Sequence, residues 1–228
     1  MLSKARAVSG GIDELRASVK GLHGGLEAEV TLVVDVMLPT SRLVDAVRAF
    51  EAEFPTVTLR LHVEALGAVA QLVQVGIAGI GIGGVPHTTM PGLEQLRIGD
   101  VELIPVAAPL HPLARNPTKS PGEARQYRQL ILTVRSSFTE GQDFGVLGAE
   151  TWRLADLGAK HALLLAGSGW GLMPEPVVRD DLASARLVRL DLPEARDCFY
   201  PLLAIYRTDN PPGPAGAWMV QRFVSQAK

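Results

Sequence analysis

The sequence lacks the features that mark exported and membrane-spanning proteins. It has a single cysteine, Cys198, so no disulfide can form within the chain, which fits a reducing compartment. No run of about 18 apolar residues is present, and the N-terminal segment lacks the apolar core of a signal peptide. These absences predict a cytoplasmic protein that does not enter a membrane.

The sequence also lacks an excess of charge of either sign. The chain has 22 basic and 24 acidic residues, a formal net charge of −2, and no basic run. Phosphate neutralisation needs clustered Lys and Arg, which argues against a nucleic-acid-binding surface within this chain. The 228 residues are 47% hydrophobic and 20% charged, so we expect a packed globular protein, long enough for two small lobes.

The N-terminal segment 2–22 has the apolar spacing of a coiled-coil seam. The spacings alternate between 3 and 4, at Ala5, Val8, Ile12, Leu15, Val19 and Leu22. Gly10 and Gly11 interrupt this pattern, and so short a helix is marginal alone. By themselves the residues fit a surface helix packed on its own domain and a coiled-coil helix equally well.

From Glu29 onward the pattern predicts strands alternating with helices. The run EVTLVVDV from Glu29 is typical of a buried strand of a parallel sheet. A helix closing at Phe54-Pro55, a strand at 57–63, a short helix at 68–75 and a strand at 77–84 follow. This order is typical of a parallel α/β unit with right-handed crossovers.

The rest of the chain predicts a second lobe reached by two crossings. Residues 93–105 are expected to form two short strands, with the chain leaving the first lobe near Val106. The strand at 198–207 is expected to return near Leu203. Two crossings make a hinge, and in such sheets ligands sit at the crevice outside the carboxyl ends of the strands.

The motifs that suggest catalysis lack the neighbouring residues or the predicted secondary structure that the chemistry needs. Gly79, Gly81 and Gly84 satisfy G-x-G-x-x-G, but they lie within a predicted strand and no helix opens after them. Ser168 lacks the first glycine and the preceding strand that G-x-S-x-G requires. The five histidines lack ligand spacing, and Cys198 fits a small buried side chain. We therefore predict no catalytic residues, no metal site and no cofactor.

Four loops at predicted strand ends form the candidate ligand site. They combine glycine or hydroxyl residues with helix starts, whose N–H groups attract anions. Arg135 offers a charge-assisted bond to a carboxylate, and Trp170 an apolar wall. For each residue alone, capping or core packing is at least as good an explanation. The candidate residues are Met37, Thr40, Ser41, Leu66, Gly67, Arg135, Ser136, Gly169 and Trp170.

The stretch AGSGWGLMPEPVV at 166–178, continued to Leu190, resembles the effector-binding domain of LysR-type transcriptional regulators. The likeness runs from about Leu26 to Ala227 and includes HPLA at 111–114 and VTLRLHV at 57–63. Gly79 departs from the family, which usually has an acidic residue there. The family's N-terminal winged helix-turn-helix is not in this sequence.

The resemblance implies an α/β fold of two Rossmann-like lobes joined by two crossover strands, of the type 2 periplasmic-binding-protein class. It implies a linker or dimerisation helix remnant at 1–25, lobe I at 26–107 plus 204–228, and lobe II at 108–203. It also implies a small effector, anionic by the loop argument, in the interlobe cleft, and a homodimer or homotetramer. Promoter DNA and RNA polymerase would be contacted only through the full-length protein.

Two other classes remain as alternatives. A free-standing solute-binding protein of a transport system has a similar topology, but needs an export signal or a lipid anchor. An enzyme ranks last, because no paired carboxylates, triad or metal set is visible in the sequence.

Overall fold

The computed structural model describes residues 25–84, 90–116, 120–133 and 145–226. The predicted coiled-coil segment at 2–22, and with it all of the predicted linker helix except Gly25, lies outside the described residues. Arg135 and Ser136 of the candidate site also lie outside them.

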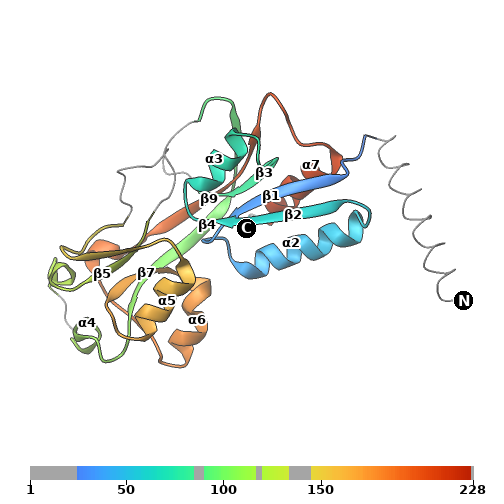
Figure 1. The fold of residues 1–228 in the computed structure, drawn as a ribbon. Helices are drawn as coiled ribbons and strands as arrows, with labels where there is room; N and C mark the ends of the chain where they lie inside the picture. The colour runs from blue at the N-terminus through green and yellow to red at the C-terminus, as the bar shows by residue number, and fades with distance from the viewer. Residues whose placement is uncertain (1–24, 85–89, 117–119, 134–144, 227–228) are drawn as a thin grey trace, which may run out of the picture.

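Lobe I contains the parallel α/β unit predicted from the sequence. Its strands β1 (Glu29–Asp35), β2 (Thr58–Glu64) and β3 (Ile80–Gly83) are parallel, in the order β2-β1-β3. The predicted strand at 77–84 is shorter than expected, because Ile77 to Gly79 precede the ladder. The carboxyl ends of the three strands point toward the rest of the molecule (Figure 1).

Helices cover both faces of the lobe I sheet (Figure 1). Helices α2 (Thr40–Glu53) and α7 (Pro214–Ser225) pack on one face, where Phe50 and Phe223 belong to the same buried cluster as apolar side chains of β1. Helix α3 (Ala68–Gln74) packs on the other face against Val33. Alternate residues of β1 therefore enter opposite core layers, and this explains why its sequence is apolar almost throughout.

Lobe II also contains three parallel strands, which are short. Strands β5 (Gln129–Leu132), β6 (Thr151–Leu154) and β7 (Trp170–Pro174) are parallel, and β8 (Val188–Arg189) pairs with β4. Helices α5 (Leu157–Leu165) and α6 (Glu175–Ala183) pack on this sheet. Shorter helices complete the lobe: α4 (Pro112–Arg115), η1 (Glu123–Gln126) and η3 (Pro193–Ala195).

Two long antiparallel strands connect the lobes, which confirms the predicted double crossing. They are β4 (Leu93–Ala107) and β9 (Phe199–Arg207). The expectation of two short strands at 93–105 is wrong. Residues 93–107 form one strand, interrupted only by a bulge between Arg97 and Gly99, where Gly99 has φ +119°. Because β9 pairs with β4 on both sides of the bulge, the ladder continues through it.

The pairings also show where the chain changes lobe. Strand β4 pairs with β7 from Leu103 onward, so it enters the second sheet earlier than the expected Val106. Strand β9 pairs with β3 at Leu203, as expected for the return. The division into domains at 107/108 and 203/204 stays a prediction, and both boundaries fall on these connecting strands.

Candidate ligand-binding site

A cavity of about 370 Å³ lies between the lobes, against both connecting strands. Lobe I contributes Met37 and Leu66, which follow the carboxyl ends of β1 and β2. Lobe II contributes residues of β5, together with Gly145, Lys160 and Leu172. The hinge side is formed by Leu103 and by the segment 197–201. Both the volume and the largely apolar lining are typical of a small-molecule site.

Asp35 organises the lobe I side of this cavity. It is the last residue of β1 and is fully buried. Its Oδ1 accepts a hydrogen bond from the Met37 amide at 2.8 Å, and its Oδ2 accepts one from the Tyr200 hydroxyl at 2.8 Å. Tyr200 belongs to β9 and lines the cavity, so one carboxyl group connects the end of β1 to the hinge.

The environment of Asp35 perturbs its acidity. Burial raises its pKa from 3.8 to about 7, although hydrogen bonds from the Met37 amide, the Tyr200 hydroxyl and the Leu66 backbone favour the charged form. Burial and the facing Asp35 carboxyl raise the pKa of Tyr200 well above 10. Asp35 therefore titrates near neutral pH, in contact with the lining residues Met37 and Tyr200.

Leu66 is held in a strained backbone conformation beside Asp35. Its φ is +51°, a left-handed value that a leucine rarely adopts. The side chain is buried and lines the cavity. Strain of this kind persists only where the surroundings determine the conformation, and it concentrates at functional sites.

Lys160 is the positive charge of the lobe II side. It comes from α5, its side chain is 3% exposed, and it lines the cavity. Its Nζ donates a 2.6 Å hydrogen bond to the Leu172 carbonyl. Burial lowers the pKa of Lys160 from 10.5 to about 8, because the apolar surroundings disfavour the ammonium form.

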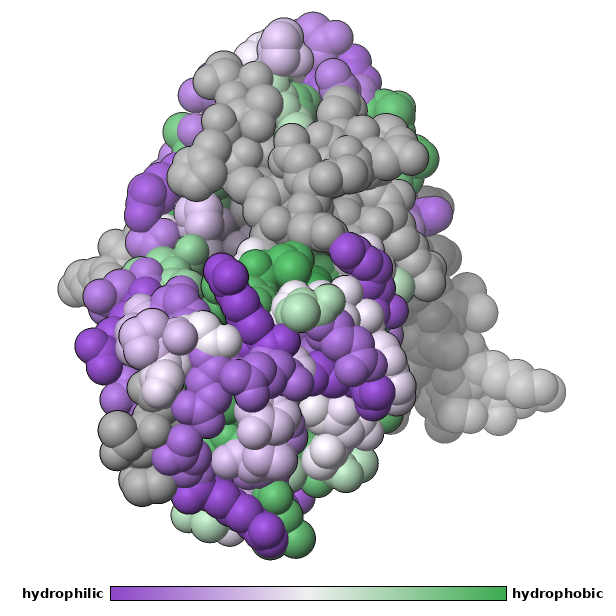
Figure 2. Space-filling view, turned by 90° about the vertical axis from the view of Figure 1, so that its left-hand side faces the viewer, coloured by the Kyte–Doolittle hydropathy of each residue, from purple (hydrophilic) through white to green (hydrophobic). Residues whose placement is uncertain are grey.

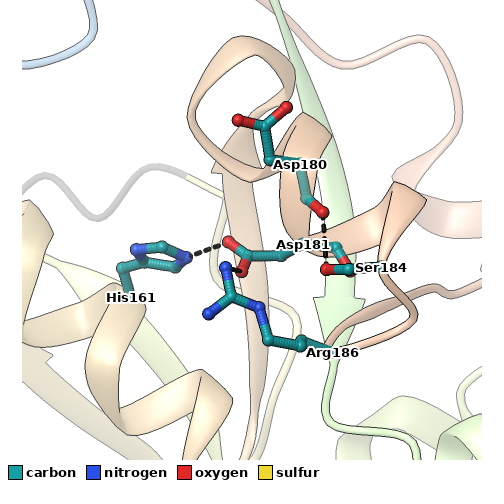
Figure 3. A network of polar contacts seen from close by, with 5 residues as sticks. All are labelled: His161, Asp180, Asp181, Ser184 and Arg186. Atoms are coloured by element: carbon teal, nitrogen blue, oxygen red, sulfur yellow. Dashed lines mark hydrogen bonds and ion pairs between the residues drawn. The ribbon is translucent and has the colours of Figure 1, made fainter.

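An acidic residue of α6 holds α5 in place. Asp181 is buried, and its carboxylate lies 2.6 Å from His161 Nε2 and 2.5 Å from Arg186 Nη2. Figure 3 shows His161 and Arg186 converging on this carboxylate, whereas the side chain of neighbouring Asp180 points away. His161 follows Lys160 in the chain, so the contact fixes the turn of α5 that carries the cavity lysine.

The structure brings together only part of the site predicted from the sequence. Met37 and Leu66 line the cavity. Thr40 and Ser41 begin α2 three and four residues after Met37 and are exposed. Gly67 is buried and precedes α3 next to Leu66. The binding roles of these residues stay predictions.

Gly169 and Trp170 lie in the interior of lobe II and not among the cavity-lining residues. A Cβ on Gly169 would stand 2.5 Å from the Arg128 carbonyl oxygen, so the backbone packs directly on the neighbouring segment. Trp170 is 0% exposed, and its Nε1 donates to the Ala124 and Tyr127 carbonyls at 3.2 and 3.3 Å. The expected apolar wall is corrected accordingly: Trp170 is a core residue, because its indole finds both its apolar contacts and its hydrogen-bond acceptors inside the lobe.

Sequence reasoning missed the charged and hinge residues of the cavity. Asp35 directly follows the apolar and β-branched run from Val30 to Val34, and Lys160 is followed by a helical apolar run. An ionisable residue inside an apolar segment is the one local signal that pointed to them. Tyr200 carries no such signal, because aromatic residues are ordinary in strands.

Metal-binding clusters and membrane-spanning helices are both absent from the described residues. Within 25–84, 90–116, 120–133 and 145–226, no group of three or more His, Cys, Asp or Glu side chains is placed to hold a metal ion. Over the same part of the chain, every helix is too short or too polar to cross a bilayer. On the face seen in Figure 2, hydrophobic surface is limited to small areas among hydrophilic residues.

The fold and the cavity together define a class of protein: a two-lobed binding domain of the type 2 periplasmic-binding-protein class. The sequence comparisons then give the family. The profile of the LysR substrate binding domain matches residues 23–228, and the chain therefore belongs to the LysR family. The recognition made from the sequence motifs is confirmed.

Named relatives and solved structures agree with this assignment. The chain is 25% identical over 226 residues to the probable HTH-type transcriptional regulator YhaJ of Escherichia coli (strain K12). The alignment covers 98% of this chain and 74% of that protein. Its fold matches the CrgA regulatory domain of Neisseria meningitidis with a TM-score of 0.66 at 15% identity, covering 89% and 100% of the two chains. The effector binding domain of QuiR in complex with shikimate gives a TM-score of 0.69 at 15% identity, covering 88% and 97%.

Proposed function

We propose that this chain is the sensing part of a LysR-type transcriptional regulator and not an enzyme. A small anionic metabolite binds in the interlobe cavity and shifts the balance between two arrangements of the lobes or of the subunits. The full-length protein, acting in the cytoplasm as a homodimer or homotetramer, converts that shift into altered binding of promoter DNA and altered contact with RNA polymerase.

The observation that carries the proposal is the cavity between the lobes. It is bounded by both connecting strands and by the carboxyl ends of β1 and β2, so an occupant contacts both lobes at once. Such an occupant binds differently to arrangements that differ in lobe position, and only a difference in affinity can shift a conformational equilibrium. The solved QuiR domain of the same fold is described with shikimate, a small carboxylate, bound.

We also propose that lobe I comprises 26–107 plus 204–228, that lobe II comprises 108–203, and that residues 1–25 belong to a linker helix. Of the candidate ligand contacts, Met37 and Leu66 have the strongest support because they line the cavity. Thr40, Ser41 and Gly67 lie beside them in sequence.

A thermal-shift screen of small carboxylates and aromatic acids tests the proposal. At a ligand concentration a hundredfold above Kd, the stabilisation is about 2.7 kcal/mol, and a domain of this size gains about 2–4 °C in Tm per kcal/mol. We therefore expect an effector to raise the Tm by roughly 5–10 °C. If no small acid and no small neutral metabolite raises the Tm, the sensing function is wrong.

A further inference from the structure

We propose that Lys160 binds the acidic group of the effector, and that the effector is a monocarboxylic acid with an apolar body of about a dozen non-hydrogen atoms. This inference rests on the proposed function. It adds to it the residue that selects the ligand and the chemical class that the cavity accepts.

The first step is that Lys160 is an incompletely satisfied cation inside the protein. An ammonium group has three donors. Among the described residues, Lys160 Nζ makes one hydrogen bond, to the Leu172 carbonyl, and no ion pair. A buried charge is costly unless it is paired, so an incoming carboxylate gains more from this lysine than from an exposed one.

The second step is that the protein is shaped to hold this lysine. Gly171 lies against the stem of Lys160: a Cβ at position 171 would stand 3.3 Å from Lys160 Cε. On the other side of α5, His161 is held by Asp181 at 2.6 Å. The ammonium group therefore has a fixed position at the cavity wall.

The third step is that Gln129 and Tyr200, the other lining side chains with N–H or O–H donors, are already engaged. The Gln129 carboxamide donates to the Gly145 carbonyl and accepts from the amides of Leu147 and Gly148, each at 2.7 Å. The Tyr200 hydroxyl is bound to Asp35 at 2.8 Å. Lys160 is thus the described lining side chain that has charge and donors left for a ligand.

The fourth step concerns the rest of the ligand. Most of the remaining lining side chains are apolar, among them Met37, Leu66, Leu132 and Phe199. Asp197, an exposed lining residue, disfavours a second negative group near it. At roughly 30 Å³ for each group of water size, a volume of about 370 Å³ holds about a dozen non-hydrogen atoms. One carboxylate on an apolar body fits these conditions, whereas a multiply charged phosphate ester does not.

Binding is measured by calorimetry on the 228-residue chain with three acids of this size and with their primary amides. The acids are 3-phenylpropanoate, cyclohexylacetate and octanoate, and sulfate serves as a small inorganic anion. We expect at least one acid to bind at pH 7 at least tenfold more tightly than its amide, and sulfate to bind weakly. Acids binding no better than their amides would overturn the proposal.

Two further measurements test the role of Lys160 itself. Lys160→Met keeps the unbranched stem of the side chain, one atom shorter, and removes its charge, and we expect it to weaken acid binding roughly 10- to 150-fold while leaving amide binding unchanged. Arg115→Met, at an exposed position on α4, is the charge-matched control and should bind as the wild type does. In the wild type, acid affinity should fall tenfold or more between pH 7 and pH 9.5, as the ammonium loses its proton.

The outcomes separate the two proposals. If Lys160→Met binds acids as tightly as the wild type, or if the wild-type affinity is the same at both pH values, Lys160 is not the anchor, although the sensing function stands. If only neutral compounds bind, the chemical class is wrong and the sensing function again stands. If no compound of either kind binds, both proposals fall. The pH comparison, repeated in Asp35→Asn so that ionisation of Asp35 cannot account for the fall, keeps the proposal falsifiable should Lys160→Met fold poorly.

Discussion

At the scale of single residues, this domain keeps two ionisable groups inside its core at the same cavity. Asp35 lies on the lobe I side and Lys160 on the lobe II side, and burial moves both pKa values toward neutrality, to about 7 and about 8. Neither shift arises from the local sequence. Each arises because folding surrounds the group with apolar side chains from distant parts of the chain.

Asp35 makes the stability of the protein depend on pH. Because its pKa is higher in the folded state than in the unfolded state, the folded protein binds the proton more tightly between pH 4 and pH 7. The free energy of unfolding therefore falls as pH rises through this window and levels off above about pH 7. At about 1.4 kcal/mol per pKa unit, the Asp35 contribution is a few kcal/mol.

The substitution Asp35→Asn tests this directly. Asparagine retains an acceptor for the Met37 amide and has no proton to lose. We therefore expect the free energy of unfolding of Asp35→Asn to depend less on pH, so that its loss of stability between pH 5 and pH 8 is smaller than that of the wild type. Urea denaturation at pH 5 and pH 8 measures it, with Asp45→Asn, at an exposed position of α2, as the control. An unchanged pH slope in Asp35→Asn would show that Asp35 does not titrate in this range.

At the scale of elements, the joint between α5 and β7 depends on bare backbone. Gly167 has φ +77°, a value that ends a helix without a Cβ clash. A Cβ on Gly171 would stand 2.7 Å from the Leu130 carbonyl oxygen. These contacts make the joint tight, and the close packing of Gly169 on the neighbouring segment explains why it is not among the cavity-lining residues.

Helices α5 and α6 are held together by Asp181, and we expect Asp181→Asn to destabilise the domain by about 1–3 kcal/mol. We expect a loss of stability at the lower end of this range, because 62% of the Arg186 side chain is exposed to solvent. Asp180→Asn is the matched control. The Asp180 side chain points away from the network, so we expect a change within about 0.5 kcal/mol. Denaturant unfolding at pH 7 measures both, and equal effects would contradict the assigned role.

At the scale of the whole molecule, the lobes share apolar packing along the hinge. Ile98, Val101, Ile104 and Val106 of β4 are buried in one continuous cluster that includes residues of both lobes. A packed hinge resists wide bending, because interiors of native density deform little. We therefore expect an effector bound at this hinge to act on small lobe movements, which the proposed assembly of subunits would amplify.

The edge of the lobe I sheet is the surface on which we expect subunits to meet. Strand β2 is the edge strand, and its Leu61 and Val63 are 41% and 56% exposed. Exposed apolar residues on an edge strand favour pairing with a second chain. We expect the chain to sediment as a dimer or tetramer, and Leu61→Lys combined with Val63→Lys to shift it toward monomer.

Analytical ultracentrifugation measures this, with Val75→Lys as the control, since Val75 is 59% exposed at the end of α3. A wild-type monomer at tens of micromolar would contradict the proposed oligomer. A variant that remains oligomeric would instead place the interface elsewhere.

The sequence alone determined the order of strands and helices, the double crossing and the family, because these follow from local periodicity, from proline and glycine positions and from contiguous motifs. It predicted Met37 and Leu66 at the cavity, since strand ends meet at one edge of a parallel sheet. Only the tertiary structure decided that Trp170 belongs to the core, that Lys160 and Tyr200 line the cavity, and that Asp35 is buried beside it. Burial, and with it the charge state of an ionisable group, depends on neighbours that come from distant segments of the chain.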